Sequence, residues 1–414
     1  MTFLEIVNYK PIESLGYLKR FIDDNNEFYL FGADSDGEFC YEWLQKRGKY
    51  VKGILDNDKK KKGDFIKGIP ILSINEINFI ECKIIITSIH SDEIAKQLQK
   101  IGLQLFEDFI AYDNLYWIDE IQFSNCVGAP FYESLINNQE RFEEVYDMLE
   151  DEYSKDIYTR VINYRLTSLN PIKRGKNNLP IPLTIHRVNG IKKIRLKNEL
   201  TSKFEKNFQK YEQDLLITGL INSTYEYKDI ITNANLNVVI DAGGFIGDTA
   251  ILFAFKNVKG KIYSFEPSKA GFEKILSLQN SFSNIEPVKK GLWNENAVLK
   301  FDERDDSLES SRIGEGESDI EVVTLDHFVE GNNISKVNFI KMDIEGAELN
   351  ALKGARGVIK RDKPDLAICI YHSPTDLWEI PLWIKTNFPE YKVYINHTDG
   401  MFVWGTVCFA TVRK

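Results

Sequence analysis

The chain has 414 residues, of which 43% are hydrophobic, so it can bury the cores of two or three domains. Its formal net charge of −10 argues against nucleic acid or an anionic membrane surface as the main partner. The five cysteines have no paired spacing, which argues against a disulfide framework or a structural zinc site. No apolar run could span a bilayer and no signal peptide is evident, so we expect a cytoplasmic protein.

Residues 1–114 alternate between strand-like and helix-like segments. Strands are expected at EFYLFGA, YVKGILD and KIIITSI, and helices at EFCYEWLQKRG and DEIAKQLQKIG. Strands that alternate with helices predict a parallel sheet with right-handed crossovers. We therefore expect a small α/β domain of Rossmann-like architecture in this region.

Residues 115–232 are predicted to form a mostly helical connecting region. Apolar residues recur there at helical spacing, including Phe142, Val145, Met148 and Leu149. The Pro, Gly and Asn residues of NPIKRGKNNLPIP then end the helical pattern.

Residues 233–414 return to an α/β pattern and form the third predicted domain. Seven strands are expected, at NVVIDA, KIYSFEP, IEPVKKGLW, VNFIKMDI, DLAICIYH, YKVYINHT and WGTVCFATV. The last two strands are predicted to pair as a hairpin.

The stretch VVIDAGGFIGDTA has the form of a nucleotide-binding strand, turn and helix. The strand ends at Asp241, and the turn holds Gly243, Gly244 and Gly247, which lack a Cβ and let the backbone approach a ligand. The turn alone is a weak signal, because a turn without a ligand can have the same residues. Glu266, at the end of the next strand, strengthens it, since a carboxylate there can accept hydrogen bonds from both ribose hydroxyls.

The charges of this turn distinguish between two cofactors. A dinucleotide places an anionic pyrophosphate over the glycine turn, where Asp241 and Asp248 would repel it. S-adenosylmethionine carries an ammonium and a sulfonium instead, and acidic residues attract both. The sequence therefore favours S-adenosylmethionine.

Six motifs in the C-terminal region resemble, in order, those of the FkbM-type S-adenosylmethionine-dependent methyltransferases. They are VVIDAGGFIGDTA, IYSFEPS, VKKGLW, VVTLDHF, NFIKMDIEGAELNALKGA and IYHSPTDLWEIPLWI. The resemblance implies a seven-stranded methyltransferase fold, a doubly wound sheet with a terminal antiparallel hairpin. It also implies O-methylation, often of sugars, glycans or secondary metabolites.

The resemblance also implies which residues bind the cofactor. Asp241, Gly243, Gly244, Gly247 and Asp248 match the first cofactor loop. Further contacts are implied at Glu266 and Pro267 beside the ribose, at Gly291, Leu292 and Trp293 in a turn near the adenine, and at Asp343. The order Ala-Gly-Gly departs from the Gly-x-Gly of many methyltransferases, but alanine is small enough for the cofactor to fit.

Three residues near the fourth and fifth strands are candidate catalytic groups. Asp343 ends a strand at the sheet edge where open α/β sheets bind ligands, and Glu345 follows it. His372 could act as the base that deprotonates an acceptor hydroxyl, because imidazole titrates near neutral pH. Helix capping is the alternative for Glu345 and Glu348, and a hydrogen bond to loop backbone is the alternative for His372.

A second histidine and a metal ion are further candidates for a catalytic role. His397 is the second candidate base, although a place in a hairpin loop also explains it. Asp343 and Glu345 offer hard oxygen ligands, but no further Asp or Asn cluster completes an octahedral magnesium site. We therefore expect no metal.

The stretch FYLFGADSDGEF resembles the opening of small Rossmann-like domains attached to sugar-modifying enzymes. Gly32 and Gly37 match the glycine turn of those domains, but Asp34 replaces the middle glycine and would repel a pyrophosphate. Three roles stay open: holding a nucleotide-linked acceptor, self-association, or a degenerate scaffold. A scaffold or association role is slightly favoured.

Together these features predict an S-adenosylmethionine-dependent O-methyltransferase that acts on a sugar, nucleotide sugar or glycan in surface polysaccharide (capsule) biosynthesis. A small-molecule or glycan acceptor and possible homo-oligomers are the expected partners. The alternatives are an NAD-linked sugar-nucleotide oxidoreductase and a non-catalytic nucleotide-binding module.

Overall fold

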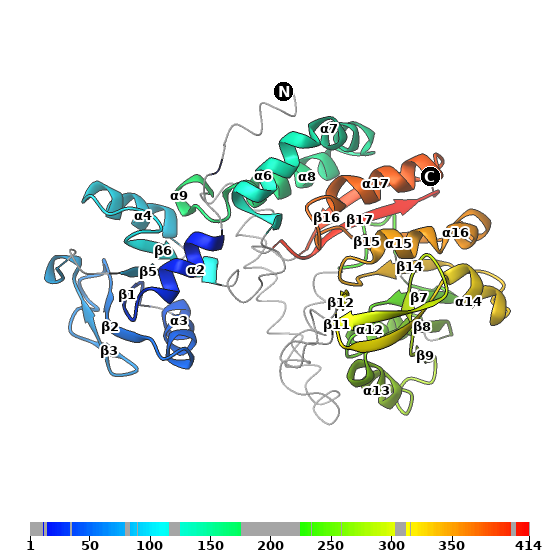
Figure 1. The fold of residues 1–414 in the computed structure, drawn as a ribbon, viewed down its shortest axis with the longest axis horizontal. Helices are drawn as coiled ribbons and strands as arrows, with labels where there is room; N and C mark the ends of the chain where they lie inside the picture. The colour runs from blue at the N-terminus through cyan, green and yellow to red at the C-terminus, as the bar shows by residue number, and fades with distance from the viewer. Residues whose placement is uncertain are drawn as a thin grey trace. The chain divides into compact units, whose positions relative to one another are not determined.

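The structure is a computed structural model, drawn as a ribbon in Figure 1. It describes residues 11, 15–33, 35–78, 83–88, 90–115, 125–174, 224–232, 234–257, 259–302, 312–314, 316–398 and 403–413. Asp34 lies outside these residues. The chain forms two compact units, Met1–Asn137 with Arg160–Leu179, and Asn138–Thr159 with Pro180–Lys414. The division into three domains stays a prediction.

The first unit is built on a six-stranded sheet with the order β3-β4-β2-β1-β5-β6. Its strands are β1 (Glu27–Phe31), β2 (Tyr50–Leu55), β3 (Phe65–Ile66), β4 (Ile69–Leu72), β5 (Ile84–Ile86) and β6 (Phe109–Ala111). Every pair is parallel except β3 with β4. All three isoleucines of β5 are buried, as expected for a parallel strand covered on both faces. The predicted N-terminal α/β sheet is confirmed.

Short helices precede, connect and follow these strands. They are α2 (Leu15–Asp23), α3 (Ser35–Lys46), α4 (Ser91–Lys100) and the 3₁₀ turns η1 (Ile74–Glu76) and η3 (Tyr112–Leu115). Leu98 of α4 packs with Phe31, Leu55 and Ile84 of the sheet in one buried cluster. The apolar strand residues and the apolar stripe of α4 thus account for the core.

In the described part of the predicted helical stretch, residues 125–174, there are four helices. They are α6 (Gly128–Asn137), α7 (Gln139–Met148), α8 (Glu152–Thr167) and α9 (Pro171–Arg174). Phe142 and Val145 are buried on α7, and Leu149, which follows its last residue, is buried as well. The helical periodicity of the sequence is therefore confirmed here.

The second unit contains a seven-stranded sheet with the order β16-β17-β15-β14-β7-β8-β9. Its strands are β7 (Val238–Ala242), β8 (Lys261–Phe265), β9 (Ile285–Val288), β14 (Phe339–Met342), β15 (Asp365–Cys369), β16 (Lys392–His397) and β17 (Thr406–Thr411). The first five are parallel, and β17 runs antiparallel between β15 and β16. All seven predicted strands and the pairing of the last two are confirmed.

The order of these strands reverses between β7 and β14. Later strands extend from β7 in one direction, through β8 and β9, while β14 and β15 lie on its other side. In open α/β sheets, ligands bind beyond the carboxyl ends of the strands at this switch point. Residues that follow β7 and β14 therefore form the edge where a site is expected.

Six helices flank the seven-stranded sheet. They are α12 (Asp248–Lys256), α13 (Lys269–Leu278), α14 (Leu325–Gly331), α15 (Glu348–Lys353), α16 (Arg356–Asp362) and α17 (Asp376–Asn387). Figure 1 shows α12 and α13 on one side of the sheet and α15, α16 and α17 on the other. Among the described residues, no helix combines the length and apolar character needed to cross a membrane.

A second sheet, which the sequence did not predict, follows β9. Its strands are β10 (Gly291–Leu292), β11 (Ala297–Asp302), β12 (Arg312–Ile313) and β13 (Ser318–Val323), in the order β10-β13-β11-β12. Phe301, Ile320 and Val322 form its small core. The expected strand IEPVKKGLW therefore ends at Val288, and Gly291 begins a separate strand instead of lying in a turn.

Candidate functional site

The loops after β7 and β14 touch each other at the switch point. Gly243 has a φ of +80°, and a Cβ added to it would lie 1.7 Å from the backbone oxygen of Asp343. The backbone N–H of Asp343 donates to the carbonyl oxygen of Ala242 over 3.1 Å. Only glycine satisfies both the left-handed backbone and this close approach. The glycine loop thereby fixes the position of Asp343.

The other two glycines of the loop are needed by the packing of the protein itself. A Cβ at Gly244 would lie 2.3 Å from Oγ of Ser264, and one at Gly247 would lie 2.3 Å from Cδ1 of Leu278. Gly247 also has a φ of +88° as the residue before α12. The loop conformation is therefore set by β8 and α13, and its predicted contact with a cofactor stays a prediction.

Asp241 lies behind the glycine loop. Its side chain is fully buried, its Oδ1 accepts from the Thr249 hydroxyl over 3.0 Å, and its Oδ2 accepts from the Ser264 hydroxyl over 2.8 Å. The ammonium of Lys341 lies 3.2 Å from Oδ1 and donates to the Gly243 carbonyl over 2.6 Å. Asp241 thus supports the loop from within, and its predicted contact with the cofactor stays a prediction.

Lys341 is a buried cation between two acids. Burial lowers its pKa, but the carboxylates of Asp241 and Asp343 raise it above the ordinary value, so the ammonium stays charged. The loss of either acid would leave a buried charge without full compensation.

Glu266 joins the end of β8 to the glycine loop. Its side chain is buried, its Oε2 accepts from the Phe245 N–H and its Oε1 from the Ser268 N–H, both over 2.9 Å. Burial raises its pKa. Each oxygen retains a lone pair that could accept from a ribose hydroxyl. Pro267, partly buried, places Ser268 as the residue that caps α13.

The remaining predicted cofactor residues lie in two places. Asp248 is the first residue of α12, and burial raises its pKa from 3.8 to about 6. Gly291 and Leu292 are buried in β10, and the N–H of Trp293 donates to the Val323 carbonyl over 3.1 Å. The contact of these residues with an adenine ring stays a prediction.

The Asp343 carboxylate accepts hydrogen bonds from two tyrosine hydroxyls and lies beside a histidine. The Tyr371 hydroxyl donates to its Oδ1 over 2.7 Å, and the Tyr225 hydroxyl donates to its Oδ2 over 3.1 Å. Nε2 of His372 lies 3.4 Å from Oδ1. Burial raises the pKa of Asp343, but Lys341, His372 and Tyr371 together lower it, so this carboxylate is ionised.

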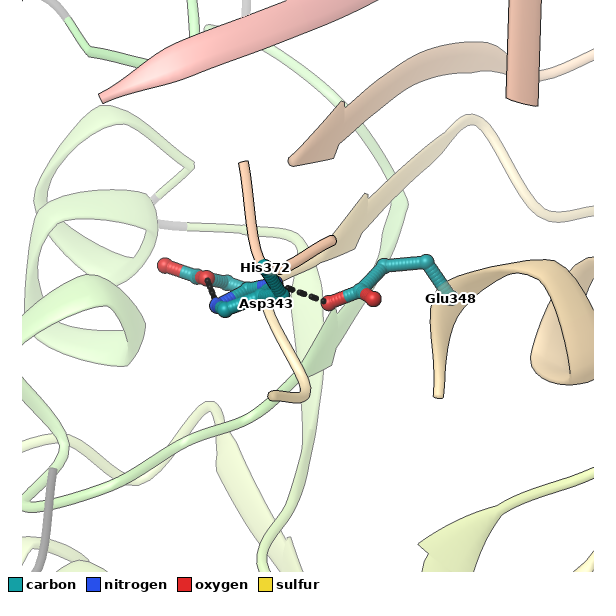
Figure 2. Close-up of side chains that lie close together, drawn as sticks. All are labelled: Asp343, Glu348 and His372. Atoms are coloured by element: carbon teal, nitrogen blue, oxygen red, sulfur yellow. Dashed lines mark ion pairs between the residues drawn. The ribbon is translucent and has the colours of Figure 1, made fainter. Parts of the chain in front are cut away.

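His372 lies between carboxylates on both of its ring nitrogens. Nε2 is 3.4 Å from Asp343 and 3.6 Å from Glu345, and Nδ1 is 3.1 Å from Glu348. Figure 2 shows the imidazole between Asp343 and Glu348. Burial lowers the pKa of His372, but Glu348 and Glu345 raise it well above 6.5. The structure thus brings the three predicted catalytic residues together.

Glu345 occupies a strained position in the loop after β14. Its φ is +54°, a left-handed conformation that costs about 1–3 kcal/mol for a residue with a side chain, and Gly346 follows with a φ of +93°. Burial raises the pKa of Glu345, although His372 lowers it in part. Strain of this kind often marks functional loops, because the surrounding structure must hold it in place.

The same cluster contains a possible metal-ligand set. Asp343, Glu348 and His372 offer oxygen and nitrogen atoms within 4.8 Å of one another. However, the two carboxylates face different nitrogens of the ring, so an ion bound at one nitrogen would leave the other carboxylate across the ring. The geometry favours ion pairs, and the expected absence of a metal stays a prediction.

Sequence reasoning missed the tyrosines and misplaced one histidine. Tyr225 precedes Asp343 by 118 residues, so no local pattern connects them, whereas Tyr371 is adjacent to His372 and could have been noticed. His397 ends β16 in a buried position instead of lying in a loop, and its Nδ1 lies 2.8 Å from the Thr406 hydroxyl. The alternative of a loop position was therefore wrong, whereas the predicted strand YKVYINHT, which includes His397, is confirmed; its role as a base stays a prediction.

Comparisons with known proteins agree with this architecture. Residues 241–397 match the family model described as the methyltransferase FkbM domain. A hexuronic acid methyltransferase, AglP, from Haloferax volcanii is 25% identical over 127 residues, which are 30% of this chain and 52% of that protein. The match thus spans about half the length of that relative.

A solved structure is similar over almost the whole chain. It is the crystal structure of methyltransferase FkbM from Methylobacillus flagellatus, with a TM-score of 0.55 and 17% sequence identity. The similarity covers 95% of this chain and 93% of that one. At this identity, the likeness establishes a shared fold.

Proposed function

We propose that this chain, whose residues 241–397 form an FkbM-type methyltransferase domain, transfers a methyl group to a hydroxyl of a sugar, nucleotide sugar or glycan. The observation that carries the proposal is the contact between Gly243 and Asp343 at the switch point of the sheet. This contact places the glycine loop and the acidic cluster at one edge, where a donor and an acceptor can meet.

The cofactor of this domain is S-adenosylmethionine, which supplies an electrophilic methyl group on a sulfonium. The residues present fit such a group, because both oxygens of Glu266 keep accepting capacity for ribose hydroxyls. The nearby Asp343, Glu345 and Glu348 form an acidic cluster that favours a cation over a pyrophosphate. The NAD-linked alternative is disfavoured on this ground.

The acceptor hydroxyl is expected to contact the outer carboxylates of the cluster. The side chains of Asp343 and Glu345 are 22% and 25% exposed, whereas that of His372 is 4% exposed. An acceptor can therefore reach either carboxylate before it reaches the imidazole. When the donor is bound, the acceptor oxygen would bond to its methyl carbon as the carbon–sulfur bond breaks and leaves a neutral thioether. The acceptor proton would pass to a carboxylate, and the His372 imidazolium would stabilise the charges beside it.

The acceptor class follows from a relative, and the biological setting from the sequence. The relative described as a hexuronic acid methyltransferase supports a sugar acceptor. A role in surface polysaccharide assembly, a cytoplasmic location and self-association rest on the sequence and its resemblance alone.

A methyl-transfer assay tests the proposal directly. The purified chain is incubated with S-adenosylmethionine carrying a labelled methyl group and with panels of free sugars, uronic acids, nucleotide sugars and glycans. We expect labelled product with the new methyl on oxygen, identified by mass and by fragmentation. A labelled product methylated on nitrogen or carbon, or saturable reduction of NAD with no labelled product, would contradict it.

A second experiment separates an enzyme from a non-catalytic module. If the chain only binds nucleotides, no acceptor gives labelled product in the wild type, and Asp343→Asn changes only stability and ligand affinity. If the proposal is right, that variant binds S-adenosylmethionine and forms product far more slowly.

A further inference from the structure

Glu348 is a buried acid that the proposed chemistry has not yet used. It is the first residue of α15, and its side chain is 1% exposed. Its Oε1 lies 3.1 Å from Nδ1 of His372 and accepts the N–H of Ile344 over 2.7 Å. In Figure 2 it lies on the opposite side of the imidazole from Asp343.

Capping of the loop before α15 does not fully explain this glutamate. The hydrogen bond from Ile344 uses Oε1 only, and Oε2 is buried with no hydrogen-bond partner among the described residues. A buried carboxylate with one unpaired oxygen destabilises a fold, and a neutral amide could accept the same N–H. The charge of Glu348 therefore has a use beyond capping.

The other side of His372 leads toward solvent. Nε2 faces Asp343 at 3.4 Å and Glu345 at 3.6 Å, and these two side chains are the exposed members of the cluster. Exposure thus rises from Glu348 through the imidazole to the outer carboxylates. The chain of ion pairs connects a fully buried charge to the groups that an acceptor can reach.

We infer that Glu348 is a positioning residue, which holds His372 from behind so that the N–H at Nε2 points toward Asp343 and Glu345. The position of His372 follows from the structure alone. The effect of Glu348 on the rate of methyl transfer rests on the proposed function. The kinetic consequence is that the two outer carboxylates keep a fixed cationic partner while one of them receives the acceptor proton.

The charges around His372 agree with an imidazolium. Glu348 from α15, Glu345 from the loop and Asp343 from the end of β14 all face the ring, and the Tyr371 ring centroid lies 4.1 Å from that of His372. Lys341 is the opposing cation, and it acts on Asp343. Burial lowers the pKa of His372, but the acids raise it well above its ordinary value.

The test uses nuclear magnetic resonance of the ligand-free, full-length chain with ¹³C at the histidine Cε1 carbons. The His372 resonance is assigned by its loss in His372→Gln, and its titration is followed in the wild type and in Glu348→Gln. The glutamine keeps an acceptor for the Ile344 N–H and removes only the charge. The matched control is Glu330→Gln, an exposed position on α14.

We expect His372 to be an imidazolium at neutral pH in the wild type and to titrate about 1 pH unit or more lower in Glu348→Gln, with no change in Glu330→Gln. A neutral ring in the wild type at neutral pH, or an unchanged midpoint in Glu348→Gln, would overturn the inference. If Glu348→Gln does not fold, the protonation state in the wild type decides alone.

A kinetic arm distinguishes this inference from the proposed function. In Glu348→Gln, kcat should fall about tenfold and its pH profile should shift, while KM for S-adenosylmethionine changes less than about twofold. An imidazolium together with no methyl transfer to any acceptor would defeat the proposed function and leave the positioning of His372 standing. A normal kcat with an unshifted pH profile would overturn the inference.

Discussion

The two α/β units of the chain begin in the same way. In each, the first strand ends in a turn with a left-handed glycine, and that glycine closely approaches the loop after a neighbouring parallel strand. A Cβ at Gly32 would lie 2.5 Å from the Thr87 carbonyl oxygen, and one at Gly243 would lie 1.7 Å from that of Asp343. The scaffold requires these glycines, because the same close approach occurs in both units.

The acids at the end of the second strand differ between the units. Asp56, which follows β2, accepts from the Ala33 N–H over 3.1 Å and pairs with the Lys61 ammonium at 2.9 Å. Glu266, after β8, accepts from the backbone N–H groups of Phe245 and Ser268. In the first unit, a lysine of the protein thus already pairs with the acid. In the second unit, the acid can still accept hydrogen bonds from a ligand.

The groups opposite the two glycine turns differ even more. In the first unit, the buried Thr87 hydroxyl donates back to the Gly32 carbonyl and completes the turn from within. In the second, Asp343 faces Tyr225, Tyr371 and His372. Among the described residues, the cluster able to do acid–base chemistry therefore lies in the second unit, which supports a scaffold role for the first.

The largest expected effect is on turnover, and we expect it for a variant in the second unit but not for the matched variant in the first. Asp343→Asn removes the charge that faces the acceptor, so turnover should fall about 10²–10⁴-fold while S-adenosylmethionine still binds. Asp56→Asn, the matched change in the first unit, should alter turnover less than about twofold. Steady-state kinetics and calorimetry check both, and equal losses in the two variants would remove the distinction between the units.

The next effect concerns the shared glycine turn. Gly243→Ala forces a Cβ against the Asp343 carbonyl in a left-handed conformation, which should destabilise the second unit by about 2–4 kcal/mol. Gly331→Ala is the control, because a Cβ there meets nothing within 4 Å. Denaturant unfolding measures both, and a Gly243→Ala protein as stable as the control would show that the close approach is absent.

A smaller effect concerns how the stability of the second unit depends on pH. The folded state raises the pKa of Asp248 from 3.8 to about 6, mainly by burial, so its ionisation destabilises the fold. This destabilisation is absent below pH 3.8 and complete above about pH 6. Asp248→Asn should therefore be more stable than the wild type by about 3 kcal/mol above pH 6 and equal to it below pH 3.8.

Thermal or denaturant unfolding across that range measures the difference for Asp248. The variant should also bind S-adenosylmethionine more weakly, because it lacks a charge that attracts the cation. A stability difference that grows as the pH falls would contradict the direction of the shift.

The smallest expected effect concerns metal ions. Because the two carboxylates lie on opposite sides of the His372 ring, chelation of divalent ions should change turnover by less than about twofold. Assays with a chelator, with and without added magnesium, measure this. A complete loss of turnover that magnesium restores would show that the cluster binds a metal ion and is not held by ion pairs alone.

The strands of both units could be predicted from the sequence because buried parallel strands are continuous apolar runs. The runs KIIITSI and DLAICIYH each correspond to a fully buried strand. The additional sheet could not be found in this way. Its strands β10 and β12 have two residues each, and β11 and β13 lie half-exposed with alternating polar residues, as a surface loop also would.

The candidate site could be predicted in part for a related reason. Asp343 and Glu266 follow recognisable strands, so the edge they share is visible in the sequence. Glu348 has the sequence position of a helix cap and does accept a loop N–H, so its local pattern gives no sign of a second contact. Its second contact, to His372, depends on how β14 and β15 lie side by side.

The most direct test of the central claim is calorimetric titration of the full-length chain with S-adenosylmethionine and, separately, with NADH. We expect saturable binding of one S-adenosylmethionine per chain, strongly weakened in Glu266→Ala and unchanged in Asp56→Asn, with no saturable binding of NADH. A folded protein that gives no heat with S-adenosylmethionine, or that binds NADH at Glu266, would contradict it.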